Sequence, residues 1–129
     1  MKTIAIFTGL SGFLAVALGA FGAHGLRGSV DVSLLDVWHT AVQYQMFHVF
    51  ALLTIVVASA GDPLPLMKWA ARLFLLGTVI FSGSLYVLVL TGIRALGMVT
   101  PIGGVLLLAG WLVLSFALVQ WVARREKGV

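Results

Sequence analysis

Four long apolar runs constrain the fold of this chain more than any other feature. They cover residues 4–24, 38–60, 69–91 and 101–122. A bilayer is crossed by about 20 apolar residues in an α-helix, so each run has the length of a transmembrane helix. The composition agrees, because 61% of the 129 residues are hydrophobic and 9% are charged, with a mean hydropathy of +1.14. We therefore exclude a water-soluble fold and predict an all-α, polytopic membrane protein, with residues 1–129 forming one four-helix bundle.

The connections between the runs carry turn and capping residues. Ser33 and, three residues later, Asp36 predict that the second helix begins near Leu34. The segment 61–65, with its glycine and two prolines, predicts a turn. Thr100 before Pro101 predicts a cap followed by the first residue of the last helix. The predicted helices are residues 4–24, 34–60, 69–91 and 101–122.

The basic residues predict the orientation of the helices. Six lie at the chain ends, between the second and third runs or at the start of the third run, and two, Arg27 and Arg94, lie in the other connections; the six are Lys2, Lys68, Arg72, Arg124, Arg125 and Lys127. Short cytoplasmic loops carry the excess of Lys and Arg. Both termini are therefore predicted to be cytoplasmic. This distribution also explains the net charge of +4 without a nucleic-acid partner.

A cluster of polar residues is expected in the outer half of the bundle. With a rise of about 1.5 Å per residue, the polar groups of the second run lie roughly 7–15 Å below the outer surface, and those of the third run lie at similar levels. Lipid offers no hydrogen bonds, so these side chains must face protein or water. The candidate polar cluster is Gln43, Tyr44, Gln45, His48, Ser82, Ser84 and Tyr86.

Three interpretations of this cluster remain open. The first is a non-enzymatic accessory or interaction protein, whose polar groups bond helices to one another. The second is a small-molecule or lipid binder with an outward-facing cavity around Tyr44 and His48. The third is an intramembrane redox or enzyme subunit. Gln43 and Gln45 point in different directions from a helix, so one of them is expected at a contact between subunits, in a homo-oligomer or a larger membrane complex.

No catalytic residue, cofactor or metal site is predicted. The chain has no cysteine, and its acidic residues lie outside the apolar runs. His39 and His48 are nine residues apart, about 13 Å along a helix and on opposite faces, so they cannot share an ion.

Two further groups of candidates concern helix packing and the outer surface. Small residues at helical spacing let helices approach closely, which suggests packing roles for Gly12, Gly19, Gly22, Gly103 and Gly104. A candidate outer-surface site for an anionic group comprises His24, Arg27 and Arg94. The alternative for the two arginines is pairing with Asp31 or Asp36.

Four stretches of the sequence resemble one protein family. They are GAFGAHGL (19–26), WHTAVQYQMFHVFALL (38–53), FSGSLYVLVLTG (81–92) and TPIGGVLLLAGW (100–111). Their combination resembles the bacterial family called domain of unknown function 423, which is related to the transmembrane protein 256 group. The resemblance implies a multi-pass, four-helix protein of the bacterial inner membrane, and it implies no cofactor or catalytic residue.

Overall fold

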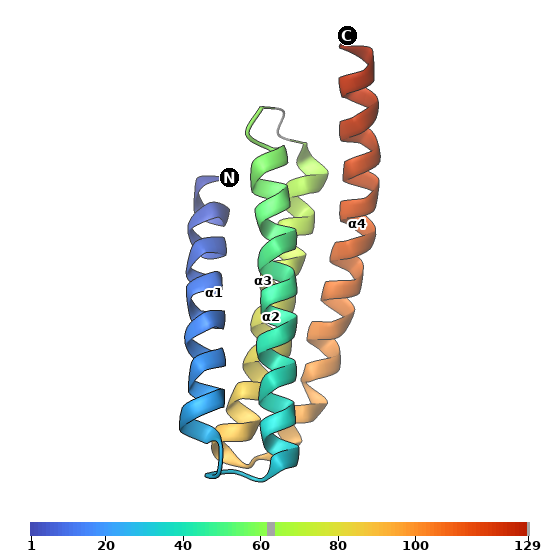
Figure 1. Cartoon of the computed structure of the whole chain (residues 1–129). Coiled ribbons are helices and arrows are strands. Elements are labelled where there is room, and N and C mark those ends of the chain that lie inside the picture. The colour runs from blue at the N-terminus through green and yellow to red at the C-terminus, as the bar shows by residue number, and fades with distance from the viewer. Residues whose placement is uncertain (62–63, 129) are drawn as a thin grey trace.

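The computed structural model describes residues 1–61 and 64–128, which form four long helices joined by short connections (Figure 1). The helices are α1 (Lys2–Phe21), α2 (Val32–Ala58), α3 (Pro65–Thr91) and α4 (Thr100–Lys127). Each is long and apolar enough to cross a membrane. The prediction of an all-α chain with four membrane-spanning helices is confirmed.

Several helix ends differ from the sequence-based prediction. Helix α2 begins two residues early, so Ser33 lies inside its first turn, and neither Ser33 nor Thr100 caps a helix through its side chain. Helix α3 already begins at Pro65, and α4 continues five residues beyond the predicted end. Residues 62 and 63 of the predicted turn lie outside the described residues.

The connections opposite the termini contain two short helical turns. A π-helical turn, η1 (Gly22–Leu26), follows α1, and a 3-10 turn, η2 (Arg94–Met98), precedes α4. Helix α3 ends at Gly92, which adopts a left-handed conformation with φ of 73° and donates its N–H to the Leu88 carbonyl at 2.8 Å. A side chain would be strained at this φ, so glycine suits the position.

The helices are arranged around a central pair, α2 and α3. Helix α1 packs on α2, α4 packs on α3, and α1 makes no extensive contact with α3 or α4. Both termini lie at the same end of the molecule, together with the end of α2 and the start of α3 (Figure 1). In an apolar stretch of 18 residues within each helix, 11% of the residues are buried in α1 and 39% are buried in α2. Helix α1 is therefore a loosely attached edge of the bundle.

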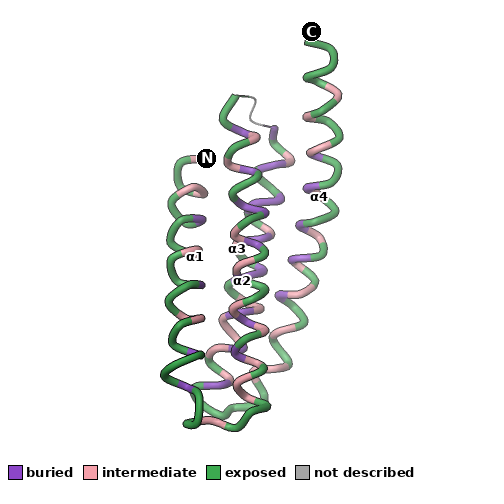
Figure 2. Tube along the Cα trace, viewed as in Figure 1, coloured by how far each residue is buried: buried purple, intermediate pink, exposed green. Residues whose placement is uncertain are grey.

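Glycines bring α3 and α4 close together, and Figure 2 shows the buried positions of α4 on the side that faces α3. A Cβ atom at Gly103 would fall on the backbone of Phe81, and one at Gly110 would lie 2.7 Å from the Phe74 ring. A Cβ atom at Gly77 would lie 2.7 Å from Leu107. Apolar burial does not drive association in lipid, so this close approach and its dispersion contacts are what hold the two helices together.

Candidate functional site

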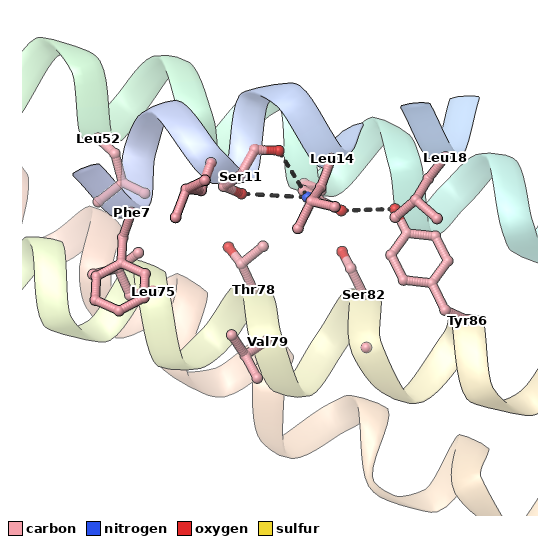
Figure 3. Close-up of a pocket in the computed structure, with 13 residues that line it drawn as sticks. Phe7, Ser11, Leu14, Leu18, Leu52, Leu75, Thr78, Val79, Ser82 and Tyr86 are labelled. Atoms are coloured by element: carbon pink, nitrogen blue, oxygen red, sulfur yellow. Dashed lines mark hydrogen bonds between the residues drawn. The ribbon is translucent and has the colours of Figure 1, made fainter. Parts of the chain in front are cut away.

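Gln45 joins three helices through its carboxamide. It is buried at the centre of α2, with 13 helical residues on either side. Its Nε2 donates to the Ser11 carbonyl at 2.9 Å and to Ser11 Oγ at 3.3 Å, and its Oε1 accepts from the Tyr86 hydroxyl at 2.8 Å (Figure 3). Both amide hydrogens are thus used. Gln45 therefore forms its hydrogen bonds within its own chain. Of the two glutamines, it is not the one available for a contact between subunits.

Both ring nitrogens of His48 form hydrogen bonds. The Trp111 indole N–H donates to Nε2 at 3.2 Å, so Nε2 must carry a lone pair. Nδ1 lies 2.7 Å from the Tyr44 carbonyl, which only accepts, so Nδ1 must carry the hydrogen. The contacts define a neutral imidazole with one tautomer, bonded between α2 and α4. Neither nitrogen has a lone pair left for a metal ion.

Two further hydrogen bonds connect the third helix to its neighbours. Ser82 Oγ donates to the Ala41 carbonyl at 2.8 Å and joins α3 to α2. Ser84 Oγ and Thr100 Oγ1 are 2.7 Å apart and join α3 to α4. With Gln45 and His48, these contacts link all four helices through polar groups.

The other two members of the candidate cluster lie on the surface. Tyr44 is 40% exposed, and its ring stacks on Phe81 with centroids 4.5 Å apart. Gln43 is exposed, and its carboxamide makes no hydrogen bond to any described residue. The structure therefore divides the predicted cluster into an internal part and an exposed part.

The candidate outer-surface residues do not form a site in the described structure. His24, Arg27 and Arg94 are all exposed and form no hydrogen bond or ring contact with one another. Within residues 1–61 and 64–128, neither arginine pairs with Asp31 or Asp36. The same residues contain no group of three His, Asp or Glu side chains placed to hold a metal ion.

The candidate packing glycines differ in how closely they approach a neighbour. A Cβ atom at Gly22 would lie 2.5 Å from the ring of Trp38. Trp38 is fully buried there, and its indole N–H donates to the Leu18 carbonyl at 2.8 Å. The remaining candidates have ordinary contact distances of 3.4–3.8 Å; they are Gly12, Gly19 and Gly104. Gly103 belongs to the close contacts of the α3–α4 interface.

A groove of about 380 Å³ runs between α1 and α3, with α2 as its floor. We call it the α1–α3 groove. Most of its lining is apolar, but five polar side chains also line it: Ser11, Gln45, Thr78, Ser82 and Tyr86. Neither Tyr44 nor His48 lines this groove.

Sequence reasoning missed the two partners that complete the internal cluster, Ser11 and Trp111. It also missed Thr78, which lies at the level of Gln45. All three lie in apolar runs. A lone Ser or Thr in such a run usually bonds its own helix, so the sequence pattern offered no reason to place Ser11 or Thr78 in the cluster. The depth of Ser11 was the available signal, since it lies near the middle of the first run.

These features define a small multi-pass membrane protein with an internal polar layer and a lateral groove. The chain belongs to the family described as protein of unknown function (DUF423), whose model matches residues 18–104. The predicted resemblance to the domain of unknown function 423 family is thereby confirmed.

Relatives match over nearly their whole length. A UPF0382 membrane protein of Staphylococcus aureus is 49% identical over 117 residues, covering 91% of this chain and 95% of the relative. A UPF0382 membrane protein of Staphylococcus haemolyticus is 47% identical over 122 residues, covering 95% and 99%. The UPF0382 membrane protein YwdK of Bacillus subtilis is 44% identical over 125 residues, covering 95% and 100%. No solved structure matches the chain.

Proposed function

We propose that this protein is a non-enzymatic interaction subunit that pairs with another transmembrane helix, in the first place a second copy of itself, through one face of α2. The observation that carries this proposal is Gln43. Its carboxamide lies within a membrane span, is exposed, and has no hydrogen bond to the described residues. An unpaired amide facing hydrocarbon costs several kcal/mol. Pairing with another chain removes that cost.

The surface around Gln43 has the spacing of a helix-pairing face. Exposed residues follow it at intervals of four and three positions, which keeps them on one side of α2 and matches a heptad pattern. We call this set the exposed α2 stripe: Gln43, Phe47, Phe50, Thr54 and Val57. Two copies meeting along this stripe would bring their Gln43 carboxamides together, and each carboxamide both donates and accepts.

The internal polar cluster supports a structural role and not a catalytic one. Gln45 and His48 are committed to neighbours on other helices. A general acid or base needs a group free to exchange a proton with a substrate, and His48 has both nitrogens bonded within the chain. The binder alternative has its best support in the α1–α3 groove, not around Tyr44 and His48.

We also propose that both termini are cytoplasmic. The six basic residues counted above belong to the end of the bundle that holds the termini (Figure 1). At the same end, Arg72 lies over the Trp69 ring at 5.1 Å and Arg125 over the Trp121 ring at 4.6 Å. Trp and Arg side chains are typical of a membrane interface. A reporter that is active only in the cytoplasm should therefore be active when it is fused to the C-terminus.

Single cysteines test the pairing directly, since the chain has none of its own. In membranes, Gln43→Cys should form a disulfide-linked dimer on mild oxidation. The control is Val105→Cys on α4: Val105 is 64% exposed and lies at a similar depth, given the contacts of Gly103 with Phe81 and of Ser82 with Ala41. Equal or absent cross-linking at both positions would contradict self-pairing. If Gln43→Cys cross-links to a different protein, the exposed α2 stripe pairs with that protein and not with a second copy.

A further inference from the structure

Thr78 is a buried threonine that differs from four others in the long helices. Those four donate their hydroxyl hydrogen to the carbonyl four residues earlier, at 2.6–3.0 Å: Thr8, Thr40, Thr54 and Thr91. Thr78 is only 8% exposed, yet its Oγ1 has no hydrogen-bond partner among the described residues. Figure 3 shows this oxygen directed from α3 toward α1, across the α1–α3 groove. A buried hydroxyl without a partner is unfavourable unless something else bonds to it.

Ser11 presents a second unused donor to the same groove. Its Oγ accepts a hydrogen from Gln45 and donates to no described residue. Ser82 and Tyr86 have already given their hydrogens to the Ala41 carbonyl and to Gln45. What the groove lacks is therefore a hydrogen-bond acceptor near Thr78 and Ser11.

Depth and charge narrow the chemistry of that acceptor. Thr78 has 13 helical residues on either side in α3, so it lies about 20 Å from each end, near the middle of the bilayer. None of the described residues that line the groove is charged. An anion would be unpaired there and strongly disfavoured. The ester carbonyls of a phospholipid lie near the headgroups, about 15 Å from the centre of a 30 Å core, and cannot reach this depth.

We propose that the α1–α3 groove binds a lipid-soluble quinone, a neutral lipid with no charged headgroup whose ring carbonyl accepts hydrogen bonds from Thr78 and Ser11. The groove volume of about 380 Å³ lies within the usual range for small ligands. The apolar part of the lining fits an isoprenoid or alkyl tail, and it includes Phe7, Leu14, Leu75 and Val79. The site goes beyond the proposed pairing function and uses none of the residues of the exposed α2 stripe.

The test measures binding of a benzoquinone with a ten-carbon tail to the full chain in phosphatidylcholine nanodiscs, by native mass spectrometry. One molecule per chain is expected at saturation. Thr78→Val keeps the side-chain shape and removes the hydroxyl, and it should weaken binding roughly three- to tenfold, the range for one neutral hydrogen bond. Ser11→Ala should weaken it as well. The matched control Thr40→Val changes a threonine that bonds its own helix, does not line the groove and does not belong to the exposed α2 stripe; it should leave binding unchanged.

A groove-filling variant provides an independent result. A Cβ atom at Gly83 has nothing within 4 Å and Gly83 lines the groove, so Gly83→Leu should fold and abolish binding. Decylbenzene, which has the same tail without carbonyls, should bind at least tenfold more weakly than the quinone. Equal binding of decylbenzene, or of the quinone by wild type and Thr78→Val, would overturn the proposal and leave a groove filled by ordinary acyl chains. Cross-linking at Gln43 does not depend on this outcome, so the two proposals fail separately.

Discussion

The two sides of the central helix pair are held together by different means. On one side, α3 and α4 meet through glycines, with a Cβ at Gly103 excluded by the Phe81 backbone. On the other side, α1 is joined to α2 by hydrogen bonds at Gln45 and Trp38 and leaves a groove along α3. Shape complementarity produces a rigid interface, whereas a few hydrogen bonds leave a side that can accommodate a ligand. The comparison predicts different responses to mutation on the two sides.

The largest effect is expected at Gly103. Gly103→Ala places a methyl group against the backbone of Phe81, which cannot move aside as a side chain would. We expect a loss of about 3 kcal/mol in the free energy of unfolding, measured by denaturant titration in detergent micelles. Gly104→Ala is the matched control, because its Cβ would lie 3.8 Å from Phe81. Equal stability of the two variants would show that the α3–α4 interface is not set by this contact.

A smaller and more local effect is expected at Gln45. Gln45→Leu removes three hydrogen bonds, and at about 0.6 kcal/mol for each in a membrane the loss is about 2 kcal/mol. Hydrogen exchange should accelerate in α1 and stay unchanged in α4, because α1 depends on this contact. Gln43→Leu should leave the exchange of α1 unchanged. If Gln45→Leu affects α4 as strongly as α1, the proposed difference between the two sides is wrong.

His48 and Trp111 allow the contact between α2 and α4 to be measured. His48→Phe should cost about 1 kcal/mol, because it leaves the Trp111 indole N–H without its acceptor. The double variant His48→Phe with Trp111→Phe should lose less than the sum of the two single variants, by about 0.6 kcal/mol. Additive losses in this double-mutant cycle would mean that the two rings do not interact energetically.

An effect of similar size but opposite sign, a gain in stability, is expected at Thr78. Thr78→Val replaces an unbonded buried hydroxyl with a methyl group, so the ligand-free protein should become more stable by about 1 kcal/mol. Thermal unfolding in detergent without added quinone measures this. A loss of stability would show that the Thr78 hydroxyl has a partner within the chain.

The fold was largely predictable because hydropathy reports transmembrane helices directly. Helix ends were less predictable: α4 extends beyond its apolar run, and Ser33 lies within α2. Residue depth placed Gln45 and His48 in a polar layer. It did not reveal which side chain bonds to which, because this depends on the rotation of α1 and α4 about their axes, and sequence spacing says little about that rotation when a helix is apolar all round.

Gln43 and Gln45 on α2 illustrate the same limit of prediction from sequence spacing. The sequence indicated that Gln43 and Gln45 point in different directions, and it did not say which of them lies inside. The structure buries Gln45 between α1 and α3 and leaves Gln43 exposed. Gln45 is the buried one because the edge helix α1 packs against the face of α2 that carries it.

The most direct test of the account is the stoichiometry of the protein ejected from its own membrane, measured by native mass spectrometry. Wild type is expected as a dimer or larger assembly, and Gln43→Leu as a monomer that remains folded. A wild-type chain that is monomeric in native membrane vesicles, with no other protein bound, would contradict the claim that the exposed face of α2 is an interface.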